Sequence, residues 1–298
     1  MYFTVYALLL VPVAVTAVAP GASRHLAPPA GVRALTCLAA TAAASTAWGL
    51  AALSLAGLAN FPPVRAHLHG EPRALAAADP VPWTVGATAG TLLALVTVRA
   101  LLVTHGLARQ RAAVAAVRHH PAAGDLVVLA DDHADAYAVP GRPPRIVATS
   151  GMLRALDAGE RAVLIAHERA HLVHRHHRYA AVADIAVAVN PLLGGLRAAI
   201  TFGVERWADE AAAEAASSRA LATRALARAA LATAARTPGA PRALSYPRHR
   251  IAARITALQA ERPRSRWHRA WPTAGLLLGA SIALVDVGVA CTRLLNAL

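Results

Sequence analysis

The sequence predicts an α-helical membrane protein with about four transmembrane helices and an inserted α+β domain. Of its 298 residues, 56% are hydrophobic and only 15% are charged, and the mean hydropathy is positive, which is not the composition of a soluble enzyme. The apolar residues also gather in four runs around one charged region. We therefore expect three transmembrane helices in 1–104, a charged domain in 105–269, and a fourth transmembrane helix with a short tail in 270–298.

Each of the four runs is long enough to cross a bilayer. The first carries no charge and no basic residues precede it, so we interpret it as an uncleaved helix rather than a signal peptide. The second is rich in small residues, which let membrane helices pack closely. The third begins with Trp83, a residue type that anchors helices at the membrane interface. The runs are 2–19, 34–59, 83–103 and 271–290.

The distribution of arginines predicts which side of the membrane each part of the protein faces. The chain has a net charge of +14, no lysine, and arginines concentrated at both ends of the charged region. Because basic flanks stay inside the cell, we expect this region in the cytoplasm, the N-terminus outside, and a multi-pass protein of the cell membrane. Its partner would be the lipid bilayer; no nucleic acid is expected, since no aromatic–basic pattern accompanies the arginines. The two cysteines, Cys37 and Cys291, indicate no disulfide framework and no cysteine metal site.

The pattern of the charged region predicts an α+β domain. Short alternating or β-branched segments separated by turn residues predict strands at 125–130, 134–139 and 145–149. Helical stretches follow at 157–179 and 196–216. Between them, 180–193 is apolar and broken by Asn190-Pro191. We expect a buried or membrane-apposed helix there, with a fifth span as the alternative.

The helix predicted at 157–179 carries an H-E-x-x-H motif, His167 to His171. Residues four apart share one helix face, so both imidazoles point the same way, as two ligands of a tetrahedral Zn²⁺ require. Glu168 is then placed to take a proton from a water molecule activated by the metal. Asp157 and Glu160 form a predicted capping box. Neither proline nor glycine interrupts 160–179, so one continuous helix is expected.

A catalytic zinc needs a third protein ligand, and two candidates compete. Glu205 and Asp209 lie one turn apart, so Glu205 can bind the metal while Asp209 holds a ligand histidine. His177 occupies the position of the third histidine in the metzincin pattern. That pattern needs a glycine where this chain has His174, so His177 is expected to face away from the metal. His174 lies too far along the helix. We expect 174–178 to form a basic helix end, favourable at a helix C-terminus and near lipid headgroups.

Taken together, these motifs resemble the membrane-bound gluzincin peptidases of families M48 and especially M56, the family of the antibiotic-sensing BlaR-type proteins. The matching elements are AYAVPG at 136–141, IVATSGML at 146–153, ERAV at 160–163, the H-E-x-x-H motif, Asn190-Pro191 and ERWAD at 205–209. The resemblance implies a zincin-like metallopeptidase domain. In it, His167, His171 and Glu205 hold zinc, Glu168 is the catalytic base, and Asp209 supports a ligand.

The chain departs from its relatives in two places. BlaR-type sensors carry an extracellular ligand-binding domain after the last span, whereas this sequence stops at Leu298, so antibiotic sensing is not carried over. M48 relatives often have a late Arg-Ile element, and here there are two, at Arg250 and Arg254. The sequence leaves open which arginine, if either, approaches the site.

We therefore expect a membrane-embedded, zinc-dependent endopeptidase whose substrate is a protein or peptide, such as a repressor or a membrane regulator. The alternative is a non-catalytic membrane scaffold or signalling component with a structural metal site. By fold-level analogy, the strand at 146–149 is expected to pair with an extended substrate.

Overall fold

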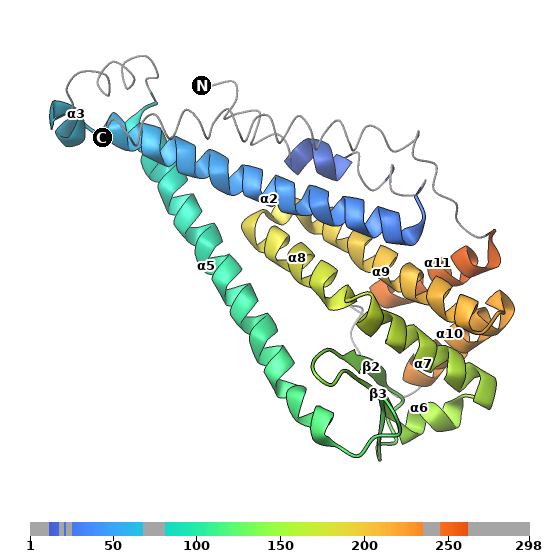
Figure 1. The fold of residues 1–298 in the computed structure, drawn as a ribbon. Coiled ribbons are helices and arrows are strands. Elements are labelled where there is room, and N and C mark those ends of the chain that lie inside the picture. Colours follow the sequence, from blue (N-terminus) through green and yellow to red (C-terminus); the bar gives the residue numbers. More distant parts are fainter. Residues whose placement is uncertain (1–11, 18–20, 22–25, 68–80, 235–244, 262–298) are drawn as a thin grey trace.

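The computed structural model describes residues 12–17, 21, 26–67, 81–234 and 245–261. Within this part, helices dominate and three short strands form one sheet. Figure 1 shows two long helices, α2 and α5, that diverge from their connection, with further helices between them and the sheet near the far end of α5. Of the predicted spans, 2–19 lies mostly outside the described residues and 271–290 lies wholly outside them.

The two long helices coincide with the second and third predicted spans. They are α2 (Pro28–Ala59) and α5 (Trp83–Ala113), with the short α3 (Pro62–His67) in their connection. Both are long and apolar enough to cross a membrane, by length and composition. Their surroundings differ: α2 is mostly buried, whereas α5 exposes a series of large apolar side chains, namely Trp83, Val85, Leu92, Leu95, Val98, Leu101 and Leu102.

Glycines let α2 and α5 approach closely where they cross. A Cβ atom added to Gly86 would lie 2.4 Å from the Cα of Gly57, and one added to Gly90 would lie 2.8 Å from the Ser54 hydroxyl oxygen. Gly86 and Gly90 are four residues apart, the small-x-x-x-small spacing that permits backbone contact between membrane helices. The close approach of the two helices therefore requires glycine, which has no side chain, at these positions.

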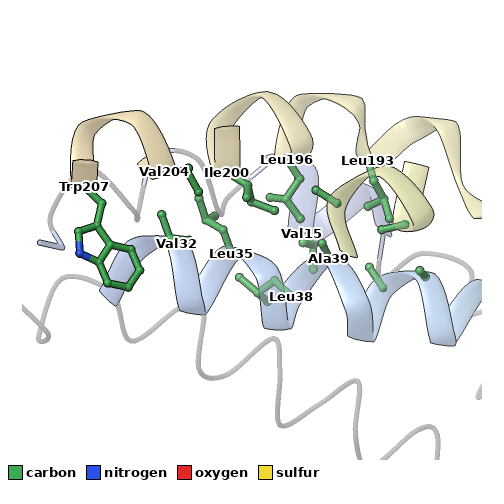
Figure 2. Packing of buried hydrophobic residues seen from close by; sticks show 14 residues of the cluster. Val15, Val32, Leu35, Leu38, Ala39, Leu193, Leu196, Ile200, Val204 and Trp207 are labelled. Carbon is green, nitrogen blue, oxygen red and sulfur yellow. The ribbon is translucent and has the colours of Figure 1, made fainter. Parts of the chain in front are cut away.

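A helical hairpin lies against α2. Its arms are α8 (His176–Val189) and α9 (Gly194–Ala215), joined by the short η2 (Pro191–Leu193). Proline ends the first arm, and at the tip Asn190 donates a hydrogen bond to the Thr46 hydroxyl at 2.9 Å. Figure 2 shows apolar side chains from α2 and α9 interleaved in one buried cluster, which includes Val32, Leu35, Leu38, Leu193, Leu196, Ile200, Val204 and Trp207. The hairpin is thus fixed to α2 along its length.

The sheet has the order β1-β3-β2, from β1 (Leu126–Leu129), β2 (Ala136–Val139) and β3 (Arg145–Thr149). β1 pairs with β3 in parallel, Val127 opposite Val147, and β2 pairs with β3 antiparallel, Tyr137 opposite Val147. All three predicted strands are confirmed within one or two residues. The expectation that 146–149 is free to pair with a substrate is wrong, because β3 is the central strand and both of its edges are occupied.

The remaining helices surround the sheet and the hairpin. α7 packs against α9, α10 and the strands β2 and β3, and α11 packs against both α10 and α9. These elements, with the short helices that link them, are η1 (Ala115–His119), α6 (Ser150–Ala155), α7 (Ala158–Val173), α10 (Arg219–Ala234) and α11 (Ser245–Gln259).

The close contact between α2 and α5 predicts that replacing glycine by alanine has opposite effects on stability at two positions of α5. Gly86→Ala places a methyl group against the α2 backbone, which cannot move aside as a side chain can, and we expect a loss of about 3 kcal/mol in stability. A Cβ atom added to Gly106 would have no neighbouring atom within 4 Å, so Gly106→Ala is the matched control. It should gain about 0.5–1 kcal/mol from higher helix propensity. Thermal unfolding in detergent measures both, and equal melting temperatures for the two variants would contradict the crossing.

Candidate metal centre

The helix that carries the motif, α7, is fixed at its N-terminus by a capping box. The Asp157 carboxylate accepts a hydrogen bond from the Glu160 backbone N–H at 2.8 Å, and the Glu160 carboxylate accepts one from the Asp157 N–H at 3.0 Å. This confirms the box predicted from the sequence. Glu160 is fully buried, and its carboxylate also accepts hydrogen bonds from Arg224 (2.9 Å) and Arg228 (2.8 Å) of α10. The start of the motif helix is therefore fixed to α10.

The outer face of α7 is joined to the sheet. Arg169, the third residue of the motif, donates two hydrogen bonds of 2.7 Å to the two carboxylate oxygens of Asp125, just before β1. Such a bidentate pair fixes orientation as well as distance. With one end on α10 and the side on the sheet, the inner face of α7 is directed at α9.

Three side chains meet between α7 and α9. The Nε2 atoms of His167 and His171 lie 3.1 Å apart, and each lies 3.7 Å from an oxygen of Glu205. Their ligand atoms all fall within 4.8 Å of one another, close enough to hold one metal ion. This is the only such group of three or more among the described residues. The structure thus brings together the three residues that the sequence predicted as ligands.

Behind these three residues lie a carboxylate and an arginine. Asp209 Oδ1 lies 3.2 Å from His167 Nδ1, the nitrogen that faces away from Glu205. Arg254 of α11 donates two hydrogen bonds to Asp209, at 2.6 and 2.7 Å, and its Nη1 lies 2.8 Å from Glu205. The sequence left the role of Arg254 open, and here it joins both carboxylates. The side chain of the rival Arg250 lies outside the described residues.

α11, which carries Arg254, is itself held by an arginine of α10. Arg219 donates hydrogen bonds to the carbonyl oxygens of Ala257, Leu258 and Ala260 at 2.9 to 3.2 Å. These belong to the last turn of α11 and the residue that follows it, where carbonyls have no partner within the helix. Arg219 also pairs with Glu210 of α9. The position of Arg254 therefore depends on α9, α10 and α11 together.

The carboxylates of Glu205 and Asp209 favour a positive charge at His167, which lies between them. Burial lowers the pKa of His167, but hydrogen bonds to Asp209 and Glu205 outweigh it and raise the pKa to about 10. Burial raises the pKa of Glu205, but His167 and Arg254 bring it down to about 2. Burial, together with the charge of His167, lowers the pKa of His171 to about 4, so that this imidazole is neutral at neutral pH. Glu205 and His171 are thus in the forms that bind metal ions, whereas His167 must release a proton to bind one.

Glu168 has a different environment from the other acids. It is 9% exposed, and burial and the charge of Glu205 raise the pKa of its carboxyl to about 7. A group with a pKa near the working pH exchanges protons most effectively in general acid–base chemistry. Glu168 is therefore the acid of this group that is suited to accepting and returning a proton.

The prediction of one continuous helix over 160–179 is wrong. α7 ends at Val173, Arg175 adopts a left-handed conformation with φ of 53°, and α8 starts at His176. His176 is 1% exposed, so it is not part of an exposed basic helix end, as the sequence suggested for 174–178. Its Nδ1 lies 3.0 Å from Nδ1 of His171. Sequence reasoning missed His176 because nothing in a run of His and Arg marks a left-handed residue.

The two rival histidines do not join the ligand group. His174 stacks on the indole of Trp207, with ring centroids 4.6 Å apart. His177 lines the cavity beside the group but is not among the three residues whose ligand atoms meet. The geometry therefore agrees with Glu205, rather than His177, as the third residue.

A cavity of about 430 Å³ opens onto the group. Its lining comes from β2, an edge strand of the sheet, and from α7, α8 and α9. Its lining includes Tyr137 and Ala138 on β2, Leu172 and Ala180 beside the break between α7 and α8, and Thr201 and Val204 on α9, together with His167, Glu168, His171 and Glu205. Glu168 and the three candidate ligands thus line the same cavity.

Comparison with known proteins gave one family. The model of peptidase family M48 matches residues 103–272, more than half of the chain, a range that contains the candidate ligands, Glu168, Asp209 and Arg254. No curated protein and no solved structure matched the chain. The match confirms the predicted relationship with M48; the narrower relationship with M56 stays a prediction.

The ion pairs of Glu160 predict how stability depends on pH. Burial raises the pKa of Glu160, but the Asp157 N–H, Arg228 and Arg224 outweigh it, so the pKa lies below the ordinary value of 4.5. Its contribution is then complete above about pH 4.5 and is lost as the pH falls through the lower folded-state value. We expect Glu160→Gln to lower the melting temperature by several degrees at pH 7, with a gap to wild type that narrows as the pH falls below about 4.5. A gap that stays constant over this range would show that the charge of Glu160 is not what stabilises the fold.

Proposed function

The chain belongs to peptidase family M48, and we propose that it is a zinc-dependent endopeptidase embedded in the cell membrane. The observation that carries this proposal is the meeting of His167, His171 and Glu205 around one point, with Glu168 beside them in the same cavity. Family membership supports a metallopeptidase that acts on a protein or peptide. The narrower relationship that we propose is with M56, because three spans would precede the domain and one would follow it.

The donor set fits zinc. Two imidazole nitrogens and one carboxylate, with room for a fourth position, form a common catalytic zinc site. Ligands about 2.0–2.1 Å from a tetrahedral ion lie about 3.3 Å from one another. The pairs here are separated by 3.1, 3.7 and 3.7 Å, so small side-chain movements suffice. His167, His171 and Glu205 would hold the ion, which would polarise the scissile carbonyl and acidify a water molecule.

The remaining residues would move protons and fix orientation. Glu168 would accept the proton of the attacking water and return it to the nitrogen of the departing amine. Asp209 would accept the Nδ1 hydrogen of His167, which directs Nε2 toward the ion. Arg254 would hold Asp209 and Glu205 in place. Because Arg254 contacts Oε2 of Glu205, Oε1 of Glu205 would remain available to the ion.

The substrate would bind along β2. This strand is at the edge of the sheet, its residues line the cavity, and its outer edge can pair with an extended backbone. This role belongs to β2 instead of the buried β3. We propose a protein substrate such as a repressor or a membrane regulator, because the domain would be tethered at the inner surface of the membrane.

Two observations support the membrane spans that we propose; the cytoplasmic catalytic domain and the N-terminus outside are proposed from the distribution of arginines alone. α5 exposes a series of large apolar side chains, the type of surface that lipid covers. The tip of the α8–α9 hairpin bonds to Thr46, 18 residues after Pro28 and thus about 27 Å along α2. In the second half of α9, Trp207 meets Arg33 in the first turns of α2. A bilayer around α2 would place the tip at membrane depth and the metal group near the cytoplasmic face.

Glutamate-to-glutamine variants of the full-length protein separate metal binding from catalysis. We expect Glu168→Gln to keep bound zinc and lose about 10²–10⁴-fold in cleavage rate, since it removes only the proton acceptor. We expect Glu205→Gln to lose zinc and activity together. Zinc content by elemental analysis and cleavage of a casein-like substrate measure both effects.

His177→Gln is the matched control for the ligand assignment and should retain zinc. Zinc loss in His177→Gln with zinc retained in Glu205→Gln would reverse that assignment. If wild type and Glu168→Gln both bind zinc and neither cleaves any substrate, the site is structural, and the protein is a scaffold or signalling component instead of a peptidase.

Cysteine labelling tests the topology. In a background with Cys37 and Cys291 replaced by alanine, Pro62→Cys in the α2–α5 connection should react with a membrane-impermeant maleimide in intact cells. Ala122→Cys, ahead of β1, should react only after permeabilisation, because it would lie in the cytoplasm. Both positions are exposed in the structure. The reverse pattern would overturn the orientation.

A further inference from the structure

The two candidate histidine ligands have different partners on their second ring nitrogen. A histidine that binds zinc through Nε2 carries its hydrogen on Nδ1, and an acceptor there fixes the tautomer and the ring orientation. For His167 that acceptor is Asp209, at 3.2 Å. For His171 the structure records no carboxylate or carbonyl at Nδ1 among the described residues; it records Nδ1 of His176, at 3.0 Å.

This contact exists only because the chain breaks between the two residues. In a continuous helix, five residues correspond to a rotation of about 140°, so a residue at 176 would point away from the face that carries His171. The left-handed Arg175 redirects the chain and brings the His176 ring back to 4.8 Å from that of His171. A left-handed conformation is unfavourable for a residue with a side chain, and such positions concentrate at functional sites.

The environment of His176 fits an acceptor more closely than a packing residue. The side chain is 1% exposed, and its ring centroid lies 4.9 Å from that of Trp207 and 6.4 Å from that of Tyr179, which fixes the ring. An imidazole that accepts at Nδ1 must carry its hydrogen on Nε2. That Nε2 is buried with no hydrogen-bond partner among the described residues. An apolar ring would fill the space without this unpaired N–H, so packing alone does not explain a histidine.

We propose that His176 is a positioning residue for the metal centre. Its Nδ1 accepts the Nδ1 hydrogen of His171 and so directs Nε2 of His171 at the ion, as Asp209 does for His167. The assignment rests on the proposed zinc site. The two histidine ligands then have different hydrogen-bond acceptors. His167 has the Asp209 carboxylate, which is paired with Arg254. His171 has the neutral imidazole of His176, which lies beside the aromatic rings of Trp207 and Tyr179.

The test measures zinc affinity of the full-length protein in detergent, by competition with a chelating dye. In His176→Phe the ring space stays filled but the acceptor is lost, and we expect zinc affinity to fall about 10–100-fold. The melting temperature of the metal-free variant should equal or exceed that of wild type, because the unpaired N–H is gone. In His176→Asn the amide oxygen takes the place of Nδ1, so affinity should stay within about threefold of wild type. The absorption spectrum of the cobalt-substituted protein should shift in the Phe variant and not in the Asn variant.

His174→Phe is the matched control, since His174 also contacts the Trp207 ring but makes no hydrogen bond to a candidate ligand among the described residues. Its zinc affinity should equal that of wild type. If His176→Phe does not fold, His176→Gln replaces it, because its longer side chain carries the amide beyond the Nδ1 position. The proposal is overturned if the variant lacking the acceptor binds zinc as wild type does, or if His176→Asn loses affinity equally. A wild-type protein that binds no zinc would instead refute the proposed function.

Discussion

The meeting of α7, α9 and α11 depends on one electrostatic constraint, the proximity of two carboxylates on a single turn of α9. Glu205 and Asp209 face the same way, and Asp209 is buried. Like charges in such a place destabilise the fold unless positive groups reach them. His167 supplies one from α7, and Arg254 supplies the other from α11, with contacts to both acids. The candidate ligands on α7 and α9, with Arg254 of α11 beside them, therefore come together only when three helices that are distant in sequence have docked.

Interactions between charged side chains also join the helices where apolar packing contributes little to their docking. The core between α7, α9 and α10 is built largely from alanine, including Ala212, Ala213, Ala222 and Ala225. Alanine lets helices approach closely, but each side chain buries little area, and burial energy scales with area. In this setting ion pairs with the buried Glu160, and hydrogen bonds from Arg219, give the docking its specificity. The pairs of Glu160 with Arg224 and Arg228 orient α10 on α7, and Arg219 orients α11 on α10.

The sequence predicted those parts of the site that local periodicity determines. His167, Glu168 and His171 share one helix, and Glu205 and Asp209 share another, so four-residue spacing alone places each set on a common face. Turn residues marked the three strands, but strand order depends on pairing between distant segments, and so β3 was wrongly expected at an edge. Arg254 was one of two candidates because its choice depends on how α11 docks. His176 was missed because its position depends on a backbone reversal at Arg175, a residue type that gives no sign of it.

The candidate metal group is also connected through α9 to α2, a helix that is predicted to cross the membrane. The first half of α9 shares its core with α2, through Leu196 and Ile200, and its second half carries Glu205 and Asp209. In that second half lies Trp207, whose ring lies under the Arg33 guanidinium of α2 and against the rings of His174 and His176. A rigid helix transmits a shift at one end to the other, because close-packed interiors have low compressibility. The charged region is therefore built onto α2 as one unit with it, and movement of α9 along α2 would displace the candidate ligand Glu205 relative to the two candidate ligands on α7.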